Sequence, residues 1–581
     1  MSQSKTYLIA DCGHSVTTVA LYKVADGGYR LISRAQVPST LTDPTPDVKI
    51  GLVTAIQEIE KVTGHELLQG DGELIRNTAQ TGRGVDYFGL TTSAATPLRL
   101  AIVAPSLNDP SVDSVRRLVQ EISNERVMVF ARDDGRDLQQ RIDELGQLRP
   151  NLIIMTHGPR KRVQADMIKL AEAVRFGQRQ LAKSDRARII YSGHESLQEV
   201  IAETLTDEIP LISVAQIRPQ ARRERLGPLR QAIQMQLQDI KLCQVPGMEG
   251  VIQWCGNKPT ATVDSLVDVV QYRAAVREGK VLLVDLEQDD LILIYGENEE
   301  IHTINRPEFG VGKPLARLLE YIEPEAFFRW LPQVIEDEEA MKERFLSYLI
   351  NQSFFPDMIP MVEEEFHFLQ AIMRTVIAQA WQDALEVWGV SAKEAAKLQT
   401  IIVRGRPLMM IPKDKESQII HILLDAIQPV GMASVVLDRY GVLPTVGKLA
   451  EQDVMAAVQT AESGVLLNLG WAIGVGGWRR NGNAATLELI TQQAGKLKIE
   501  IDWGNIEVLA IPVTMSGDLE INPSFLAHVG GRYRRQESLE NVSGDLVVGV
   551  VVDARGRPLK FPKDELERSE LIKKWTTDIG G

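Results

Sequence analysis

The sequence predicts a mixed α/β protein built from several domains, and three observations lead to this prediction. Residues 97–216 alternate five apolar strands with four amphipathic helices, the pattern of a parallel sheet with right-handed crossovers. A strand–turn–strand segment at 7–22 returns in similar form at 281–296. After about residue 480 the chain turns to short strands, so a β-rich C-terminal domain is expected. A chain of 581 residues is too long for one core and suggests roughly two to four domains.

Composition and charge are those of an ordinary soluble globular protein. The net charge of −14 argues against general nucleic-acid binding, and the basic stretch at 218–231 is interpreted as a solvated helix face. Cys12, Cys243 and Cys255 are widely spaced and form no metal-binding pattern, which fits a reducing compartment. The sequence contains no apolar run that predicts a membrane span, and its first residues do not resemble a signal peptide. We therefore expect a cytoplasmic protein without direct membrane insertion.

The first hairpin carries the pattern Asp-x-Gly-x-Ser-x-Thr, formed by Asp11, Gly13, Ser15 and Thr17. This pattern is typical of a nucleotide phosphate hairpin. A carboxylate positions a metal ion or its waters, a Gly lets backbone N–H groups approach phosphate oxygens, and hydroxyls donate further hydrogen bonds. We predict Asp11 near a metal ion and the other three residues around phosphate. The alternative is a hairpin retained only for strand pairing, and Cys12 inside it is interpreted as a small core residue.

Two such hairpins with helices around both predict a two-lobed actin-like ATPase core of the ribonuclease H-like kind. In that architecture each of two similar halves contributes a phosphate hairpin, and the second is expected to read Asp-x-Gly-Gly-x-Thr. Here Asp285 is present, but no Gly follows it, and Glu287, Asp289 and Asp290 bring three carboxylates instead. Side chains block close backbone approach, and the acids repel phosphate. Such a cluster either holds Mg²⁺ or Ca²⁺ or is an acidic turn in water.

A later strand-to-helix turn is expected to hold adenosine, and it is similarly reduced. Gly405 is the single small residue, and it stands between Arg404 and Arg406. Arg404 has the chemistry to stack on a base or to meet a phosphate. With one intact motif out of three, the sequence predicts a core that kept its shape and lost some or all of its catalysis.

The domain organisation follows from the same patterns. A helix is predicted at 47–62 with Asp47 as its N-cap, and a charged helix at 563–577. The segment Asp553–Pro558 is predicted to be a surface β-turn. The predicted domains are a first actin-like lobe at 1–96 and 217–280, an inserted parallel α/β subdomain at 97–216, a second actin-like lobe with a helical insertion at 281–478, and a C-terminal β-rich domain at 479–581.

Several stretches together resemble the glutamate mutase accessory proteins of the MutL type, which are unrelated to the mismatch-repair protein of similar name. The segment at 9–22, Ile-Ala-Asp-Cys-Gly-His and the strand after it, looks like the first hairpin of that family. Residues 91–95 with Leu98 and Arg99 are similar to its Ser-Ser-Ala-x-Gly-Leu-Arg segment. Residues 423–450 are similar to a distinctive stretch near the end of its ATPase core. The combination is specific, and it runs through most of the chain.

The resemblance implies an actin-like ATPase fold, ATP or ADP with Mg²⁺ as cofactors, and a role as chaperone or reactivating factor for an adenosylcobalamin-dependent mutase. Two departures concern the nucleotide positions. The family usually has Asp-Val-Gly-Gly-x-Thr-Thr at the second hairpin, where this chain has the acids at 285–290. Near 154–160 the family tends to have Gly-Gly-x-Asp-Gly-Gly, and here His157 is interpreted as a loop residue.

Three hypotheses for the function remain at this point. The first is a noncatalytic or weakly nucleotide-binding protein that acts as a scaffold or chaperone-like partner of another protein. The second is an active ATPase that reactivates an adenosylcobalamin-dependent mutase. The third is a self-assembling actin-like structural protein, which would form a homo-oligomer and rests on analogy of fold alone.

Overall fold

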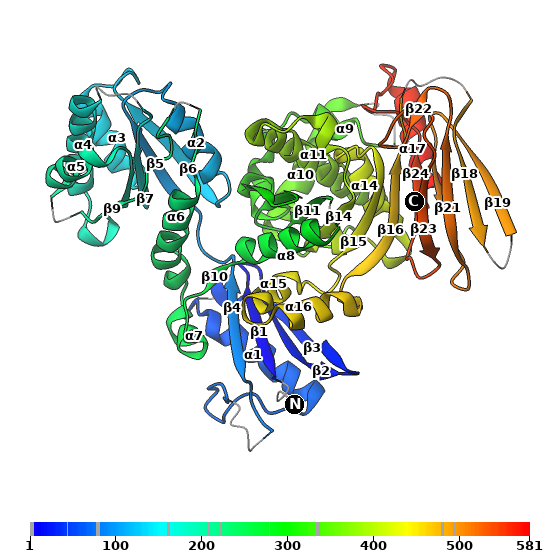
Figure 1. Ribbon diagram of the computed structural model, residues 1–581, viewed down its shortest axis with the longest axis horizontal. Helices are drawn as coiled ribbons and strands as arrows, with labels where there is room; N and C mark the ends of the chain where they lie inside the picture. The colour runs from blue at the N-terminus through cyan, green and yellow to red at the C-terminus, as the bar shows by residue number, and fades with distance from the viewer. Residues whose placement is uncertain are drawn as a thin grey trace. The chain divides into compact units, whose positions relative to one another are not determined.

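The fold is that of a computed structural model of the chain (Figure 1). Its internal contacts divide it into two compact units. The first unit comprises Met1–Tyr7, Ala20–Arg34 and Val263–Gly581, and the second comprises Leu8–Val19 and Ala35–Thr262. The structure describes residues 5–42, 44–76, 82–159, 163–206, 209–220, 222–277, 279–332, 337–477, 482–491 and 495–580.

A five-stranded sheet is built around the N-terminal hairpin, with the strand order β10-β4-β1-β2-β3. Its first strand, β1, is buried along its whole length. Helix α1 begins at the predicted N-cap, because the side chain of Asp47 accepts a hydrogen bond of 2.8 Å from the backbone N–H of Lys49. The elements are β1 (Tyr7–Cys12), β2 (Val16–Ala25), β3 (Gly28–Pro38), α1 (Val48–Thr63), β4 (Tyr87–Thr92), β10 (Thr260–Ala261) and α8 (Thr262–Arg277).

The inserted segment forms a separate five-stranded sheet in the order β6-β5-β7-β8-β9, and every strand pair in it is parallel. The prediction of strands alternating with helices is confirmed, and the order is that of a doubly wound α/β sheet. The elements are β5 (Leu98–Ala104), α2 (Pro110–Val119), β6 (Asn124–Ala131), α3 (Leu138–Leu148), β7 (Leu152–Thr156), α4 (Gln164–Arg179), β8 (Arg188–Ser192), α5 (Gln198–Leu205), β9 (Leu211–Ser213) and α6 (Gly227–Ile240). Helix α7 (Met248–Cys255) follows in the chain but packs beside the N-terminal sheet, where the ring of Trp254 lies 5.8 Å from that of Phe88 in β4.

Both faces of this inserted sheet are covered, which explains why its strands are almost continuously apolar. Alternate residues of β5 face opposite cores. Ala101 and Val103 pack in the core that includes residues of α3, α4 and α5, whereas Leu100 and Ile102 pack in the core that includes residues of α2 and α6. The period of two in the strand and the apolar stripes of the helices therefore specify the same layered arrangement.

An eight-stranded sheet forms the centre of the first unit, in the order β13-β12-β11-β14-β15-β16-β24-β20. Its first five strands repeat the order of the N-terminal sheet: third, second, first, fourth and fifth strand along the chain. This duplication is expected of the two similar halves of an actin-like core. The strands are β11 (Lys280–Leu286), β12 (Leu291–Glu297), β13 (Glu300–Arg306), β14 (Thr400–Arg404), β15 (Gly431–Leu437), β16 (Leu467–Gly474), β20 (Ile506–Leu509) and β24 (Gly549–Asp553).

The helices of the first unit pack an extensive apolar core against this sheet. None of the described helices combines the length and the apolar character of a transmembrane span. Short 3₁₀ turns lie at Thr40–Thr42, Lys183–Asp185, Glu195–Leu197, Leu242–Gln244, Pro307–Phe309, Lys313–Glu320 and Lys413–Lys415, and a π-helical turn at Ala461–Val465. The α-helices are α9 (Glu325–Phe328), α10 (Glu338–Phe354), α11 (Glu363–Trp388), α12 (Ala392–Ala395), α13 (Arg406–Met409), α14 (Ser417–Ala426), α15 (Leu443–Gln452), α16 (Val454–Thr460) and α17 (Glu565–Asp578).

The C-terminal region is rich in strands, as predicted, but it is not separate from the second lobe. Strands β20 and β24 belong to the eight-stranded sheet, because β24 pairs in parallel with β16. The predicted boundary at residue 479 therefore divides strands that share one sheet. The remaining strands form an antiparallel sheet in the order β19-β18-β21-β23 and a small β17-β22 pair. They are β17 (Gly476–Gly477), β18 (Asn483–Thr491), β19 (Gly495–Asp502), β21 (Ser516–Pro523), β22 (Ala527–His528) and β23 (Glu537–Ser543).

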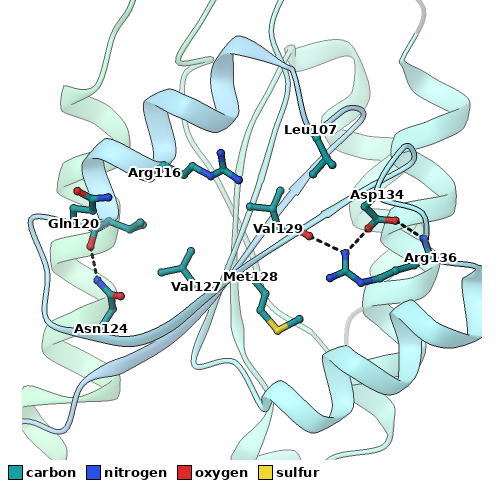
Figure 2. A pocket seen from close by; sticks show the side chains of 10 residues that line it. Leu107, Arg116, Gln120, Asn124, Val127, Met128, Val129, Asp134 and Arg136 are labelled. Carbon is teal, nitrogen blue, oxygen red and sulfur yellow. Dashed lines mark hydrogen bonds and ion pairs between the residues drawn. The ribbon is translucent and has the colours of Figure 1, made fainter. Parts of the chain in front are cut away.

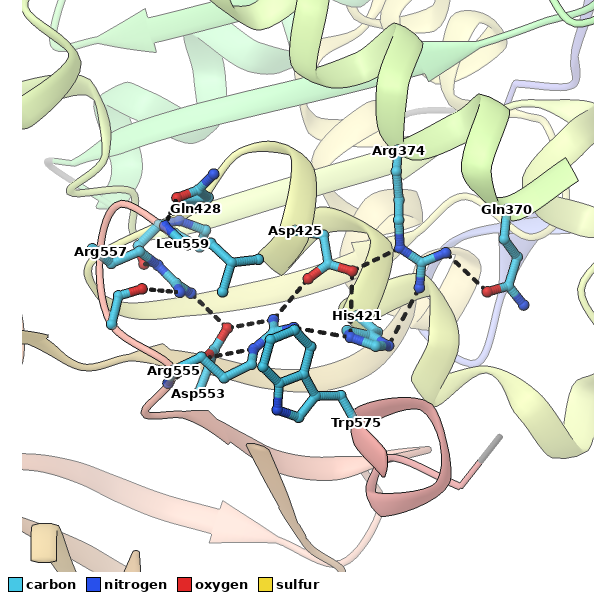
Figure 3. Close-up of polar contacts among 12 residues, drawn as sticks. Gln370, Arg374, His421, Asp425, Gln428, Asp553, Arg555, Arg557, Leu559 and Trp575 are labelled. Atoms are coloured by element: carbon cyan, nitrogen blue, oxygen red, sulfur yellow. Dashed lines mark hydrogen bonds and ion pairs between the residues drawn. The ribbon is translucent and has the colours of Figure 1, made fainter. Parts of the chain in front are cut away.

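A buried network of charged side chains joins this region to α11 and α14 (Figure 3). The Arg555 guanidinium donates two hydrogen bonds to Asp553, of 3.0 and 2.7 Å, and forms an ion pair of 2.8 Å with Asp425. Arg374 donates a hydrogen bond of 2.6 Å to the other oxygen of Asp425. Asp553 and Arg555 are 0% and 1% exposed, so the prediction of a surface turn at 553–558 is wrong. The turn ends a buried strand and pairs with helices distant in sequence, which local composition does not reveal.

The electrostatics of the network follow from its burial. Burial alone would raise the pKa of Asp553, but Arg555 and Arg557 hold it well below its usual range. Burial lowers the pKa of His421 to about 3, so this imidazole is neutral. His421 Nε2 lies 3.3 Å from Asp425 and 3.2 Å from Arg555 Nη1, and its Nδ1 lies 3.3 Å from Arg374 Nη2. Each charge is thus balanced by a neighbour inside the core.

Breaking this network is expected to destabilise the protein strongly. Arg555→Leu leaves Asp553 and Asp425 buried without their shared partner, so the free energy of unfolding should fall by about 3–5 kcal/mol in chemical denaturation. The matched control is Arg535→Leu, which removes an exposed ion pair with Glu537 and should cost less than about 1 kcal/mol. Equal losses in the two variants would contradict a role of burial.

Candidate functional site

Asp11 stands at the end of β1 and is held by two hydroxyl groups from neighbouring elements. Its Oδ1 accepts hydrogen bonds from Thr91 Oγ1 at 2.8 Å and from Thr262 Oγ1 at 2.6 Å. The carboxylate is 7% exposed, and Thr91 is fully buried at the end of β4. Neither threonine was predicted as a site residue. Their position in the sequence could have indicated them, because each threonine stands where a strand ends. Strands β4 and β10 are parallel neighbours, so their ends lie at one edge of the sheet.

The other three residues of the first motif serve mainly the hairpin itself. Gly13 donates its N–H to the carbonyl of Val16 at 2.8 Å, and a Cβ on Gly13 would lie 2.7 Å from that oxygen. The carbonyl of Ser15 accepts a hydrogen bond of 2.9 Å from Ser39 N–H. Thr17 is fully buried, and its hydroxyl has no hydrogen-bond partner within the described part of the chain. The hairpin therefore uses the glycine N–H that a phosphate would need.

Cys12 between these residues is a core side chain, as predicted. It is 0% exposed, and burial raises the pKa of its thiol well above the usual range. The protonated thiol is chemically inert, because the thiolate is the reactive species. Cys12 contributes packing to the hairpin.

The second hairpin contains a buried ion pair that the sequence did not reveal. Asp285, near the end of β11, lies in register with Arg404 on the parallel strand β14. Arg404 Nη1 donates a hydrogen bond to Asp285 Oδ2. The same guanidinium lies 3.3 Å from Glu287 Oε1 through Nη2 and 3.7 Å from Asp438 Oδ2 through Nε. One arginine thus stands among three carboxylates, and two of them, Asp285 and Asp438, are almost fully buried.

Burial dominates the electrostatics of this acidic turn. It raises the pKa of Asp285 well above the usual range, and the charge of Arg404 opposes that rise. Burial also raises the pKa of Asp438, although Arg404 and two backbone N–H groups favour its ionised form. Burial also raises the pKa of Asp290, to about 7, although a 3.0 Å hydrogen bond from Asn305 favours the ionised carboxylate. Asp290 is therefore the acid of this turn whose negative charge is reduced near neutral pH, while Asp285 stays paired with Arg404.

Backbone from a neighbouring segment packs against this turn. The backbone of Gly310 and Gly312 lies on it, because a Cβ added to Gly310 would come within 2.5 Å of the carbonyl carbon of Asp289. Val311 N–H donates to the carbonyl of Glu287 at 2.9 Å. The resident cation is Arg404, and its side chain is 6% exposed. Arg404, interpreted from the sequence as a group for a base or a phosphate, is here the counter-ion of carboxylates that belong to the chain itself.

Gly405, predicted for the adenosine turn, is required here by packing. Its φ is 118°, and a Cβ would lie 1.7 Å from the carbonyl oxygen of Leu286. The backbones of β11 and of the turn after β14 thus touch at this glycine. The structure brings Asp285 and Gly405 to the same end of the same sheet, through strands β11 and β14.

Across the residues that the structure describes, no group of three or more His, Cys, Asp or Glu side chains is placed to hold a metal ion. The alternative of an acidic turn in water is wrong, because Asp285 and Gln288 in this hairpin are only 2% and 3% exposed. His157, interpreted as a loop residue, follows β7 and is 2% exposed, with Nε2 3.1 Å from the hydroxyl of Tyr191. Arg160 lies outside the described residues.

A hollow of about 560 Å³ lies beside β6 of the inserted sheet. Figure 2 shows side chains that line it. Val127 and Val129 contribute apolar wall. Its charged groups are paired, since Arg136 Nη1 donates a hydrogen bond of 2.9 Å to Asp134 and Arg136 Nε one of 2.8 Å to Glu144. None of the predicted site residues lines the hollow, so it adds no group to the candidate site.

Comparison with known proteins gives one extended match. The model of a family described as MutL protein matches residues 7–465. A search of the curated proteins finds no match.

The solved structures are only distantly similar. Nucleotide-free acetone carboxylase is 9% identical, with 86% of this chain and 81% of that chain covered and a TM-score of 0.33. The ATP-dependent caprolactamase from Pseudomonas jessenii is 13% identical, with 85% and 81% covered and a TM-score of 0.32. A Ppx/GppA family member from Aquifex aeolicus is 12% identical, with 80% and 89% covered and a TM-score of 0.19. At these scores no property of those proteins transfers to this chain.

Adding a methyl group at Gly405 is expected to destabilise the protein by about 3 kcal/mol or more in chemical denaturation. The new Cβ of Gly405→Ala meets backbone of Leu286, which has no free rotamer to move away. The control is Gly27→Ala, also at a positive φ of 82° but with nothing within 4 Å of the added atom. It should cost only about 1 kcal/mol. Similar losses would show that backbone conformation alone, and not the contact, requires Gly405.

Asp290 is expected to make stability depend on pH. Its pKa is about 7 when folded and about 4 when unfolded, so the folded protein binds the proton more tightly between these values. The stabilisation is complete below about pH 4 and is lost as pH rises through about 7. From pH 5 to pH 8 the wild type should lose about 2 kcal/mol more than Asp290→Asn, as measured by denaturation at both values. Asp545→Asn, at an exposed position, should keep the wild-type dependence. An unchanged slope in Asp290→Asn would contradict this assignment.

Proposed function

This chain belongs to the MutL protein family, and on that premise we propose that it is a noncatalytic or weakly nucleotide-binding accessory protein. It acts as a scaffold or chaperone-like partner of another protein. The resemblance to glutamate mutase accessory proteins makes an adenosylcobalamin-dependent mutase the favoured partner. In this proposal the chain has the actin-like fold but does not hydrolyse ATP efficiently.

The single observation that carries the proposal is the place of Arg404. A working second hairpin offers backbone N–H groups and room for phosphate, and it relies on a bound cation to balance charge. Here the guanidinium is already committed to Asp285 and Glu287. A phosphate would have to displace buried carboxylates from this arginine, and each would then be left without its partner.

The first hairpin supports the same proposal in a weaker way. The N–H of Gly13 donates a hydrogen bond to the carbonyl of Val16 within the hairpin, and Thr17 is buried in the core. Asp11 remains the one residue of the motif with a carboxylate suited to a metal ion or its waters. If Mg²⁺ with ATP or ADP binds, Asp11 is the residue that would hold the ion. The hydroxyl of Ser15, four residues later in the chain, would then contact phosphate.

The alternative of an active ATPase that reactivates a mutase is favoured by one observation. Asp11 is oriented by the hydroxyls of Thr91 and Thr262, at 2.8 and 2.6 Å, in a nearly dry setting. Such fixed second partners are usual around metal-binding carboxylates.

Nucleotide titration separates the two functions. We expect Mg-ATP and Mg-ADP to give no binding heat in calorimetry and no thermal stabilisation at millimolar concentration, because a ligand stabilises the folded protein only when its concentration is comparable to or above its Kd. Turnover of Mg-ATP that is abolished by Asp11→Ala, yet kept in the exposed control Asp545→Ala, would overturn the noncatalytic proposal and establish the ATPase.

A further inference from the structure

The surface around the end of α10 exposes an unusual number of large apolar side chains. We define the α10 apolar patch by Leu346, Ile350, Phe354, Phe355, Ile359 and Met361, which are 43%, 39%, 75%, 66%, 63% and 85% exposed. Scattered apolar residues are common on protein surfaces, but a group within so short a segment marks an interaction site.

The helical period explains how part of the patch arises. Leu346, Ile350 and Phe354 are spaced four residues apart, so they lie on one side of α10. The opposite side of the helix is also apolar, and Phe345 and Leu349 pack in the core. Only one side of α10 packs in the core, so the apolar side chains on its other side remain exposed.

The connection to α11 continues the apolar surface. Phe355 N–H donates to the carbonyl of Asn351 at 2.9 Å, so this residue follows directly on the last turn of the helix. Met361 N–H donates to the carboxylate of Glu365 at 2.8 Å, which fixes the most exposed member beside the start of α11. The patch is therefore presented by ordered backbone and does not depend on a free end.

The acidic side chains near the patch favour a partner with basic side chains. Residues 337–365 contain eight acidic and two basic side chains, a net charge of −6 in a chain whose total is −14. Glu363, with 88% of its side chain exposed, adjoins the apolar connection. A second copy would bring the same acids against each other, and an anionic membrane surface would be repelled in the same way. A basic partner gains attraction from the same field.

We propose that the α10 apolar patch is the docking surface for a protein segment that presents apolar side chains flanked by Lys or Arg. This inference deepens the proposed function, on which it rests only in taking the chain to act on another protein. Apolar contact supplies the main affinity, and the acids of 337–365 select the sign of the partner's charge.

A defined probe tests the surface directly. The probe is a fluorescent amphipathic helical peptide made of Leu and Lys, and its counterpart carries Glu in place of Lys. By fluorescence anisotropy the Lys peptide should bind the full chain, and the Glu peptide should bind at least tenfold more weakly. Rising salt should weaken the Lys peptide, because the acidic flank is exposed. Equal binding of the two peptides would overturn the proposed charge selection.

Matched variants locate the binding on the chain. Phe355→Ser with Met361→Ser should weaken the Lys peptide at least tenfold, whereas Val513→Ser, at an apolar residue that is 84% exposed elsewhere, should leave it unchanged. Glu343→Gln with Glu363→Gln should weaken it about threefold and flatten the salt dependence. All substituted side chains are exposed, so the variants should keep the wild-type melting temperature, which is measured alongside.

Other occupants give distinct results, each of which overturns the proposal. Light scattering that shows a wild-type dimer and a monomeric Phe355→Ser, Met361→Ser variant would assign the surface to a second copy. Binding to phosphatidylcholine vesicles that is lost in the same variant would assign it to a membrane. Peptide binding that survives this double substitution would place the site elsewhere. None of these results depends on whether nucleotide binds, so failure here is distinct from failure of the noncatalytic proposal.

Discussion

The ion pair between Asp285 and Arg404 is the interaction on which the second hairpin depends. Strands β11 and β14 are parallel neighbours, and their register sets the two residues side by side inside the sheet. A buried carboxylate is tolerated only with a close partner, and here the partner is a guanidinium that belongs to the chain. The turn that follows can then carry Glu287 and still fold, because the same arginine reaches it. Arg404 thus supplies the positive charge that faces these carboxylates inside the sheet.

The same principle governs the junction with the C-terminal region. Arg555 is fully buried and shares Asp553 and Asp425 with other arginines, so a strand near the C-terminus is tied to α11 and α14 by charge as well as by apolar packing. Geometry of this kind is specific, because each carboxylate must meet its donors at hydrogen-bond distance. A neutral His421 completes the network without adding charge.

Burial and exposure are thus distributed in an uncommon way in the first unit. Charged groups lie inside, where Asp285, Arg404 and Arg555 are nearly inaccessible, while Phe354 and Met361 are exposed on the surface. Buried ion pairs contribute little net stability, and exposed apolar area contributes none until something covers it. Both features are therefore better explained by specific structure and by recognition than by stability alone. An accessory protein whose work is contact with a partner fits that distribution.

The sequence by itself determined the class of the fold and most of its local elements. The alternation at 97–216, the two hairpins and the N-cap at Asp47 were predictable, because apolar periodicity and capping act between residues a few positions apart. It also placed acids at the second hairpin, where their number argued against phosphate.

Only the tertiary structure decided what those acids do. Arg404 pairs with Asp285, Thr262 with Asp11, and Arg555 with Asp425, and in each pair the residues are more than a hundred positions apart in the sequence. Thr91 lies eighty positions from Asp11. Such partners are set by strand register and by the packing of helices on a sheet, and neither leaves a periodic mark in the local sequence. The addition of β20 and β24 to the central sheet was hidden for the same reason, since a strand's own residues do not name the neighbour with which it pairs.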